Sequence, residues 1–191
     1  MDYLFVVRHG ETKANVRGIE AGPLDYALTK KGVKEASFVA KALSKVRISA
    51  VYSSPVLRAV ETAEILARPH ELKVKTLEEL TEAKIKPKFV GKIGRHHILT
   101  DPEAYSETND DLLERTGKAV EIVRKEASGN VILVSHGDVI TAMLERVVER
   151  RVSNERYYVI HPEPAALSII DTRDKPFLVL YNYRRKMFAD F

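Results

Sequence analysis

Residues 4–10 read Leu-Phe-Val-Val-Arg-His-Gly, and residues 131–137 read Val-Ile-Leu-Val-Ser-His-Gly. In each stretch, a short apolar run typical of a buried strand in a parallel sheet is followed by a histidine and a glycine. The C-terminal ends of parallel strands share one edge of the sheet, and open α/β sheets bind their ligands at that edge. We therefore expect His9 and His136 to meet in one pocket, as the reactive groups of an enzyme do.

Strand and helix patterns alternate along the chain, which predicts the α/β fold class. Thr29 and Ser54 are expected to cap two of the helices. The predicted helices are residues 12–16, 29–44 and 54–67, one that begins near residue 109, and one after residue 137 that buries apolar residues up to Val148. The predicted strands are residues 3–7, 50–52, 72–75, 131–134, 167–170 and 177–180.

These elements predict one domain over residues 1–191. Its expected architecture is a single doubly wound, mostly parallel sheet flanked by helices. The last two strands are expected to form an antiparallel hairpin that closes the sheet. Residues 78–106 show little periodicity and are expected to form an irregular insertion or lid near the active site.

Composition describes an ordinary soluble domain, with 45% hydrophobic and 30% charged residues. No apolar stretch approaches the ~18 residues that a membrane span needs, so no membrane partner is expected. Cysteine is absent, which excludes disulfides, thiolate nucleophiles and cysteine zinc sites. Together with an N-terminus that shows no signal pattern, this favours a cytoplasmic location. Abundant charge and the absence of glutamine suit a thermophilic source.

The net charge of +4 has more than one interpretation. Much of the excess lies in Arg150-Arg151 and in residues 184–186, which we interpret as solvated surface. No nucleic-acid partner is expected, because the chain shows no recognition motif and no basic face with interleaved aromatic residues. A mild positive field would help to attract a small phosphorylated substrate. The sequence leaves the oligomeric state open and allows a homodimer.

Three segments carry groups suited to phosphate chemistry. Arg8 supplies a planar fork that matches phosphate oxygens, His9 can attack phosphorus, and Gly10 lets a ligand approach the backbone closely. Arg58 stands in the first turn of a helix that follows another strand, and His136 brings a second imidazole to the same edge. Taken singly, Arg58 could be a surface residue and His136 a core or capping residue, whereas together they indicate an anion site.

Five segments form a pattern when they are taken in order. Asn15 follows the first of them by three residues. The segments are Arg-His-Gly-Glu-Thr at 8–12, Asp-Tyr-Ala-Leu-Thr at 25–29 with a glycine at 32, Ser-Ser-Pro-Val-Leu-Arg-Ala-Val-Glu-Thr-Ala at 53–63, Leu-Thr-Glu at 80–82 and Ser-His-Gly at 135–137. At these spacings they resemble the histidine phosphatase superfamily, the phosphoglycerate mutase-like family, over most of the chain.

The resemblance implies a mechanism of phosphoryl transfer. His9 would be the nucleophile that becomes a phosphohistidine. Glu82 would protonate the leaving oxygen and then activate water, although Glu78, Glu79 and Glu107 lie close enough in sequence to be rivals. The residues that would bind the substrate, without a metal or another cofactor, are Arg8, Arg58, His136, Asn15 and Gly137.

The chain also departs from the family pattern. Ala27 stands where proline is usual, residues 89–91 read Phe-Val-Gly where the family often has Gly-x-Trp-Glu-Gly, and residues 106–108 read Ser-Glu-Thr in place of Gly-Glu-Ser. The last two changes lie where specificity is normally set, so the substrate is unassigned. We interpret His96 and His97 as exposed loop or lid residues rather than metal ligands. Solvation is expected, with recognition of a second anionic group as the alternative, for Lys84, Lys86, Lys88 and Lys92.

The sequence therefore predicts a metal-independent phosphatase that hydrolyses a small phosphate monoester through a phosphohistidine. A 2,3-bisphosphoglycerate-dependent phosphoglycerate mutase is the nearest alternative, and the short chain favours hydrolysis because mutases of this family are usually longer. A phosphohistidine-protein phosphatase is a third, which the insertion at 78–106 disfavours. Two alternatives lie outside this class of enzyme. One is a metallohydrolase that uses His9, His136 and Glu82 as metal ligands, which the nearby arginines disfavour. The other is a non-catalytic phosphate-binding module.

Overall fold

The fold is described from a computed structural model for residues 1–94, 102–147 and 162–184. Within these ranges six strands form one sheet in the order β3-β2-β4-β1-β5-β6. The strands are β1 (Tyr3–Arg8), β2 (Ile48–Ser53), β3 (Val74–Thr76), β4 (Asn130–Ser135), β5 (Leu167–Asp171) and β6 (Phe177–Tyr183). The helices are α1 (Lys13–Arg17), α2 (Lys30–Leu43), α3 (Leu57–Ala67), α5 (Asn109–Glu126) and α6 (Gly137–Val147), with short 3-10 turns at η1 (Arg68–His70), η2 (Glu78–Leu80), η3 (Pro87–Phe89) and η4 (Pro102–Ala104).

The sheet is mostly parallel, as predicted. β3, β2, β4 and β1 run in the same direction, whereas β5 is antiparallel to β1 and β6 is antiparallel to β5. β1 and β4 are neighbours, and Arg8 pairs with Ser135 at their C-terminal ends. His9 and His136 therefore leave two adjacent strands at the same level of the sheet.

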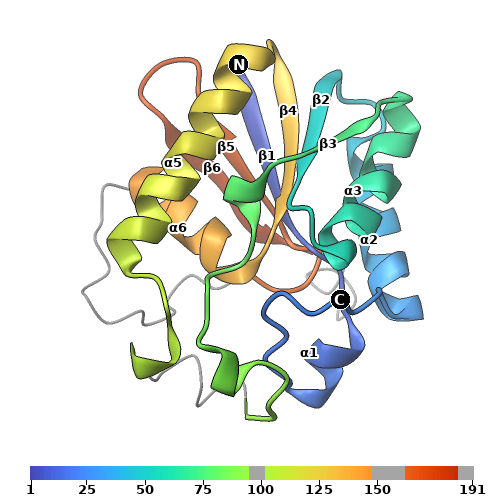
Figure 1. Cartoon of the computed structure of the whole chain (residues 1–191). Helices are drawn as coiled ribbons and strands as arrows, with labels where there is room; N and C mark the ends of the chain where they lie inside the picture. The colour runs from blue at the N-terminus through green and yellow to red at the C-terminus, as the bar shows by residue number, and fades with distance from the viewer. Residues whose placement is uncertain (95–101, 148–161, 185–191) are drawn as a thin grey trace.

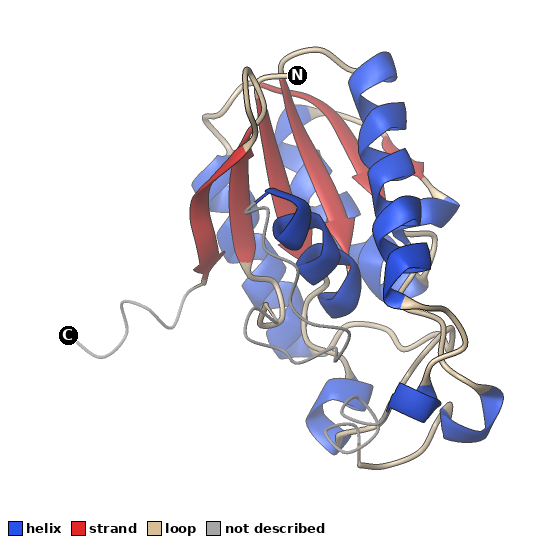
Figure 2. Cartoon of the chain, turned by 90° about the vertical axis from the view of Figure 1, so that its left-hand side faces the viewer, coloured by secondary structure: helices blue, strands red, loops and turns tan. Residues whose placement is uncertain are grey.

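Helices cover both faces of the sheet, which confirms the doubly wound prediction (Figures 1 and 2). Along β1 the side chains alternate as a pleated strand requires: Leu4 and Val6 join the core formed with α5 and α6, and Phe5 and Val7 join the core formed with α2 and α3. All four side chains are buried, so β1 is covered on both faces and its apolar run is continuous.

Two capping residues were predicted, and one of them was wrong. Thr29 caps α2 as expected, since its side chain accepts a hydrogen bond from the Gly32 N–H. Ser54 does not cap α3, because that helix begins at Leu57 after the extended residue Val56. The Ser54 hydroxyl lies 2.8 Å from His136 Nε2, and this bond holds Ser54 at the sheet edge.

The bounds of all six strands differ from the prediction by one to three residues, and β6 extends the predicted 177–180 to Phe177–Tyr183. β2 extends the predicted 50–52 to Ile48–Ser53, and β3 lies at Val74–Thr76 rather than at 72–75. α6 buries most of the apolar residues that were predicted to face the core, and Val148 lies outside the described residues. No helix in the described ranges is apolar over a length that would cross a membrane.

The insertion at 78–106 is packed against the rest of the domain where it is described. Leu80, Ile85 and Tyr105 are buried in the core beside α5 and α6. Backbone bridges join Ile85 to Tyr105, and Ile93 to Ile19 in the loop after α1. The insertion and α1 consequently lie together below the C-terminal ends of the strands in Figure 1. His96 and His97 lie outside the described residues.

Candidate active site

The two predicted histidines meet at the edge of the sheet. The ring centroids of His9 and His136 are 5.3 Å apart, with the planes inclined by 60°. The His9 backbone N–H donates to the Ser135 carbonyl at 2.9 Å, which continues the β1–β4 ladder to the end of both strands. Both imidazoles are buried. The adjacency of β1 and β4 thus brings together residues that are 127 positions apart.

His9 is held in one tautomer by its own loop. Its Nδ1 lies 2.8 Å from the Gly10 carbonyl oxygen. A carbonyl oxygen only accepts, so Nδ1 carries the proton and Nε2 keeps its lone pair. Burial, followed by the positive charges of Arg58 and Arg8 and by His136, lowers the pKa of His9 well below its usual value of 6.5. At neutral pH the Nε2 of His9 is therefore unprotonated and keeps its lone pair.

Two guanidinium groups lie at the same edge and are almost fully buried. Arg8 ends β1, and its Nη1 donates to the Pro162 carbonyl at 2.6 Å. Arg58 stands in the first turn of α3, and it donates to the carbonyls of Gly22 at 3.0 Å and Leu24 at 3.1 Å. These carbonyls orient the two planar groups. An anion with several oxygens is the ligand that this geometry suits.

A close contact between two glycines fixes the loop that follows β1. A Cβ atom on Gly10 would lie 2.7 Å from the Gly32 carbonyl oxygen, and one on Gly32 would lie 2.2 Å from the Glu11 carbonyl oxygen. The loop therefore rests directly on the first turn of α2. The Gly10 N–H donates to the Thr62 hydroxyl at 3.0 Å, and that hydroxyl donates to the Arg58 carbonyl at 2.8 Å. The loop is thus tied to the helix that carries Arg58.

The side chains of Thr62 and Ser54 also support the site, although the sequence did not predict a role for them there. Ser54 bonds the second imidazole at 2.8 Å, and Thr62 supports the loop of the first. Both belong to the segment at 53–63 that resembles a family motif. Their recurrence in that motif is the signal that could have identified them, whereas their local sequence predicts only a cap and a helix position.

Asn15 and Gly137 have structural roles that are visible in the fold. Thr12 caps α1, because its hydroxyl accepts from the Asn15 N–H at 3.2 Å, and the Asn15 side-chain oxygen completes this capping box by accepting from the Thr12 N–H at 2.9 Å. Gly137 opens α6 directly after His136. The role of both residues in substrate binding stays a prediction.

The segment with Glu82 crosses the ends of β2 and β4. The Leu77 N–H donates to the Ser53 carbonyl at 2.9 Å, and the Ser135 hydroxyl donates to the Leu80 carbonyl at 2.7 Å. Leu80 is completely buried, so the segment is fixed directly beside the residue that precedes His136. The half-buried Glu82 carboxylate accepts from the Ala83 N–H at 3.0 Å.

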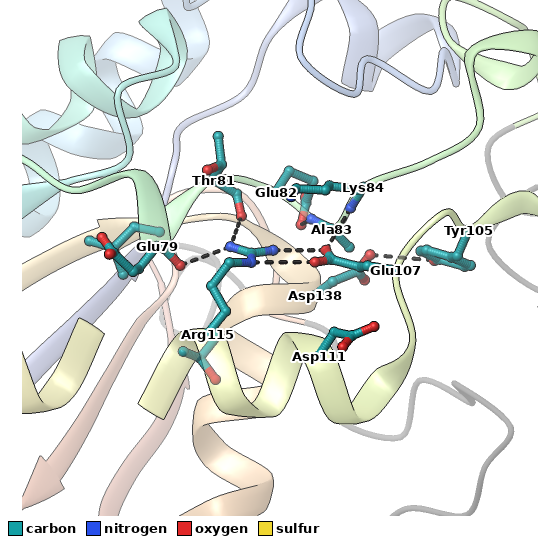
Figure 3. A network of polar contacts seen from close by, with 12 residues as sticks. Glu79, Thr81, Glu82, Ala83, Lys84, Tyr105, Glu107, Asp111, Arg115 and Asp138 are labelled. Carbon is teal, nitrogen blue, oxygen red and sulfur yellow. Dashed lines mark hydrogen bonds and ion pairs between the residues drawn. The ribbon is translucent and has the colours of Figure 1, made fainter. Parts of the chain in front are cut away.

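The three rival glutamates have other environments, and Figure 3 shows Glu79 and Glu107. Glu107 is ion-paired to Arg115 at 2.8 Å and accepts from the Lys84 N–H at 2.7 Å. Glu78 and Glu79 line an open cleft of about 410 Å³ between η2 and α5, on the side of this segment that α5 covers. Among these four glutamates, Glu82 is neither paired with Arg115 nor part of the lining of this cleft.

The insertion's lysines are spread over several environments. Lys86 forms an ion pair with Glu103 at 3.1 Å, Lys88 lies over the ring of Phe89, and Lys84 lines the cleft beside α5. In the described part of the chain, no three His, Asp or Glu side chains cluster as ligands of a metal ion would. His9, His136 and Glu82, the ligand set that a metallohydrolase would need, therefore do not form such a cluster.

Comparison with known proteins gives consistent matches. The family model for branch 1 of the histidine phosphatase superfamily matches residues 4–184. A metal-independent phosphoserine phosphatase of Arabidopsis thaliana is 28% identical, over 92% of this chain and 79% of its own. A 2,3-bisphosphoglycerate-dependent phosphoglycerate mutase of Thermoplasma acidophilum is also 28% identical, over 94% of this chain and 92% of its own. The solved structure of YhfR from Bacillus stearothermophilus has a TM-score of 0.83 and 26% identity, over 94% of this chain and 96% of its own.

Proposed function

Because this chain belongs to the histidine phosphatase superfamily, we propose that it is a metal-independent phosphatase that hydrolyses a small phosphate monoester through a phosphohistidine. One observation carries the proposal: the Nδ1 of His9 is bound to the Gly10 carbonyl, so Nε2 is a buried, unprotonated nucleophile beside Arg8 and Arg58. Phosphoryl transfer needs mainly positioning and stabilisation of charge, and these residues supply both.

In the first half-reaction, His9 Nε2 attacks phosphorus as the bond between phosphorus and the ester oxygen breaks. Arg8, Arg58 and His136 surround the phosphoryl oxygens and stabilise the charge that spreads over them. The protonated carboxyl group of Glu82 gives its proton to the ester oxygen, so the alcohol leaves as a neutral molecule. The products of this step are the alcohol, phosphorylated His9 and the Glu82 carboxylate.

In the second half-reaction, the Glu82 carboxylate takes a proton from water. The hydroxide oxygen bonds to phosphorus while the bond between phosphorus and His9 Nε2 breaks. Inorganic phosphate leaves, and both His9 and the protonated Glu82 are regenerated. One carboxyl group thus serves first as the acid and then as the base, as the two opposite proton transfers require.

A mutase is the second candidate, and one comparison specifically favours it. The Thermoplasma mutase aligns with this chain over 92% of its own length, so chain length does not separate the two reactions. A mutase must also hold a second anionic group. Among the described lysines of the insertion, Lys86 is paired with Glu103 and Lys84 lies in the outer cleft, which supports a substrate without a second anionic group. A cytoplasmic location, a thermophilic source and a homodimer remain predictions.

The test of the mechanism is to trap the intermediate. Brief reaction with a labelled phosphate ester should label the native protein with an acid-labile, base-stable phosphoryl group, and His9→Ala should abolish both the label and turnover. His70→Ala is the matched control, because His70 lies in η1 away from the site. Turnover by His9→Ala at the native rate would overturn the proposal.

A separate measurement distinguishes hydrolysis from the mutase reaction. The native protein is incubated with 3-phosphoglycerate, with and without 2,3-bisphosphoglycerate, and the products are identified. Release of inorganic phosphate supports the phosphatase. Formation of 2-phosphoglycerate that depends on the bisphosphate assigns the chain to the mutases instead.

A further inference from the structure

Arg115 of α5 makes four hydrogen bonds with its guanidinium group, two of them to the segment that carries Glu82 (Figure 3). Its Nη1 donates to the carbonyls of Glu79 and Thr81, both at 2.8 Å. Its Nε and Nη2 donate to the two carboxylate oxygens of Glu107, at 3.3 and 2.8 Å. One guanidinium group therefore fastens the residue before Glu82 to a carboxylate on a different segment.

Glu107 completes the attachment on the other side of Glu82. Its Oε1 accepts from the Lys84 N–H at 2.7 Å, and the neighbouring Ser106 N–H donates to the Lys84 carbonyl at 2.8 Å. The contacts thus bracket Glu82, with Thr81 held by Arg115 and Lys84 held by Glu107. The two ends of a four-residue stretch are fixed, and the acid lies between them.

This arrangement is costly to build and specific in shape. The side chains of Arg115 and Glu107 are only 16% and 7% exposed, so both charges have lost most of their water. A buried ion pair is weak support for stability alone, because desolvation offsets much of the attraction. The fork of arginine satisfies a carboxylate and two carbonyls at once, which the point charge of a lysine cannot do.

Position is what a general acid requires most. A carboxyl group must reach within hydrogen-bond distance of the ester oxygen, and a displacement of about 1 Å can cost about 10²-fold in rate. We propose that Arg115 and Glu107 are positioning residues that hold the segment at 81–84 so that Glu82 reaches the leaving oxygen. This inference rests on the proposed function, in which Glu82 is the acid.

The test compares two esters that need the acid to different degrees. An alkyl phosphate has a poor leaving group and depends on protonation, whereas a nitrophenyl phosphate depends on it little. In Arg115→Met, kcat/KM for the alkyl ester, which reports only the formation of the phosphohistidine, should fall about 10- to 100-fold, with a loss at least tenfold smaller for the aryl ester. Glu107→Gln should show the same selectivity with a smaller loss, since its amide oxygen still accepts from Lys84. Arg115→Lys should recover only part of the activity.

A double variant separates positioning from general support. If Arg115 acts through Glu82, the variant Glu82→Gln/Arg115→Met should hydrolyse the alkyl ester no more slowly than Glu82→Gln alone. Lys118→Met is the matched control, because Lys118 lies on the same helix and lines the same cleft but pairs with Glu114. This control should keep the native rate on both esters.

The outcomes distinguish this inference from the proposed function. Equal losses on both esters, or additive losses in the double variant, would overturn the positioning role while Glu82 remains the acid. If Glu82→Gln itself shows no preference between the esters, the assignment of the acid in the proposed function fails. Thermal unfolding of each variant is measured in parallel, and if Arg115→Met does not fold, the selectivity of Glu107→Gln decides the question.

Discussion

Gly32→Ala should destabilise this protein, although the substitution would ordinarily stabilise a helix. Gly32 lies in the first turn of α2, and alanine is favoured over glycine within helices by roughly 0.5–1 kcal/mol. The new Cβ atom would lie 2.2 Å from the carbonyl oxygen of Glu11 and 2.7 Å from its amide nitrogen. Both are backbone atoms of the loop that follows His9, so no side-chain rotation relieves the contact.

The magnitude follows from the distance. Ordinary contacts between carbon and other heavy atoms begin at about 3.5 Å, so α2 and the loop must separate by about 1 Å. Forcing an extra methyl group into a packed region costs about 1–3 kcal/mol. After the helix preference is subtracted, we expect the free energy of unfolding to fall by roughly 1–2 kcal/mol. The same shift would displace His9 and lower kcat/KM by up to about 10²-fold.

Gly117→Ala is a matched control in a second helix. There the added Cβ would lie 2.6 Å from Nη1 of Arg146, the far end of a flexible side chain that donates to the Leu113 carbonyl. That side chain can rotate away, so the loss of one exposed hydrogen bond of about 1 kcal/mol roughly cancels the gain in helix preference. Gly117→Ala should therefore leave stability and kcat/KM almost unchanged.

The assay is urea unfolding at neutral pH, together with steady-state hydrolysis of nitrophenyl phosphate by the same samples. Equal slopes of the free energy against urea concentration would show that the variants unfold from comparable states. Gly32→Ala with native or higher stability and native kcat/KM would refute the inferred contact between Gly32 and the catalytic loop.

Three further predictions concern the site itself. Arg58→Ala should lower kcat/KM by the equivalent of roughly 2–4 kcal/mol, and a loss below about threefold would mark Arg58 as dispensable. Glu82→Gln should slow an alkyl phosphate much more than a nitrophenyl phosphate, with Glu79→Gln as the control, and a larger alkyl-specific loss in the control would move the acid to Glu79. The pKa of His9 is lowered in the folded protein, so below pH 6.5 the unfolded chain binds more protons than the folded chain. The free energy of unfolding that depends on neutral His9 is therefore present above that pH and is lost as the pH falls. Urea unfolding between pH 7 and pH 5 should show this slope in the native protein and a smaller slope in His9→Gln, and parallel slopes would contradict the lowered pKa.

The parts of the fold that were predictable are those with strong local patterns. The apolar runs before Arg8 and Ser135 are short, continuous and rich in β-branched residues, and their assignment to central strands proved correct. The start of α3 was not predicted correctly. Ser54 is a good local cap, but its hydroxyl instead bonds His136 across the site. A contact between residues 82 positions apart outweighed a local preference, and no local pattern records such a contact.

The candidate site divides in the same way. His9, Arg58 and His136 could be placed together from the sequence, because each follows a strand that ends at one edge. The residues that support the site could not be predicted, because their side chains bond backbone carbonyls that are far away in the sequence. The bond from the Ser135 hydroxyl to the Leu80 carbonyl and those from Arg115 to Glu79 and Thr81 join a segment without periodicity to the sheet and to α5.

Arg58 acts on His9 as well as on the substrate, and the dependence of rate on pH separates the two effects. The lost contact with the phosphoryl group lowers the rate of Arg58→Ala at every pH. The lost positive charge raises the pKa of His9 toward its usual value, although burial, the largest cause of the shift, still holds that pKa below 6.5. The acid limb of kcat/KM reports the free enzyme, so in Arg58→Ala this limb should move to higher pH, after correction for the second ionisation of the substrate phosphate near pH 6. Arg58→Lys keeps the charge without the planar fork, so its acid limb should stay at the native pH while its rate is reduced. An acid limb that stayed in place in both variants would show that Arg58 does not set the protonation of His9.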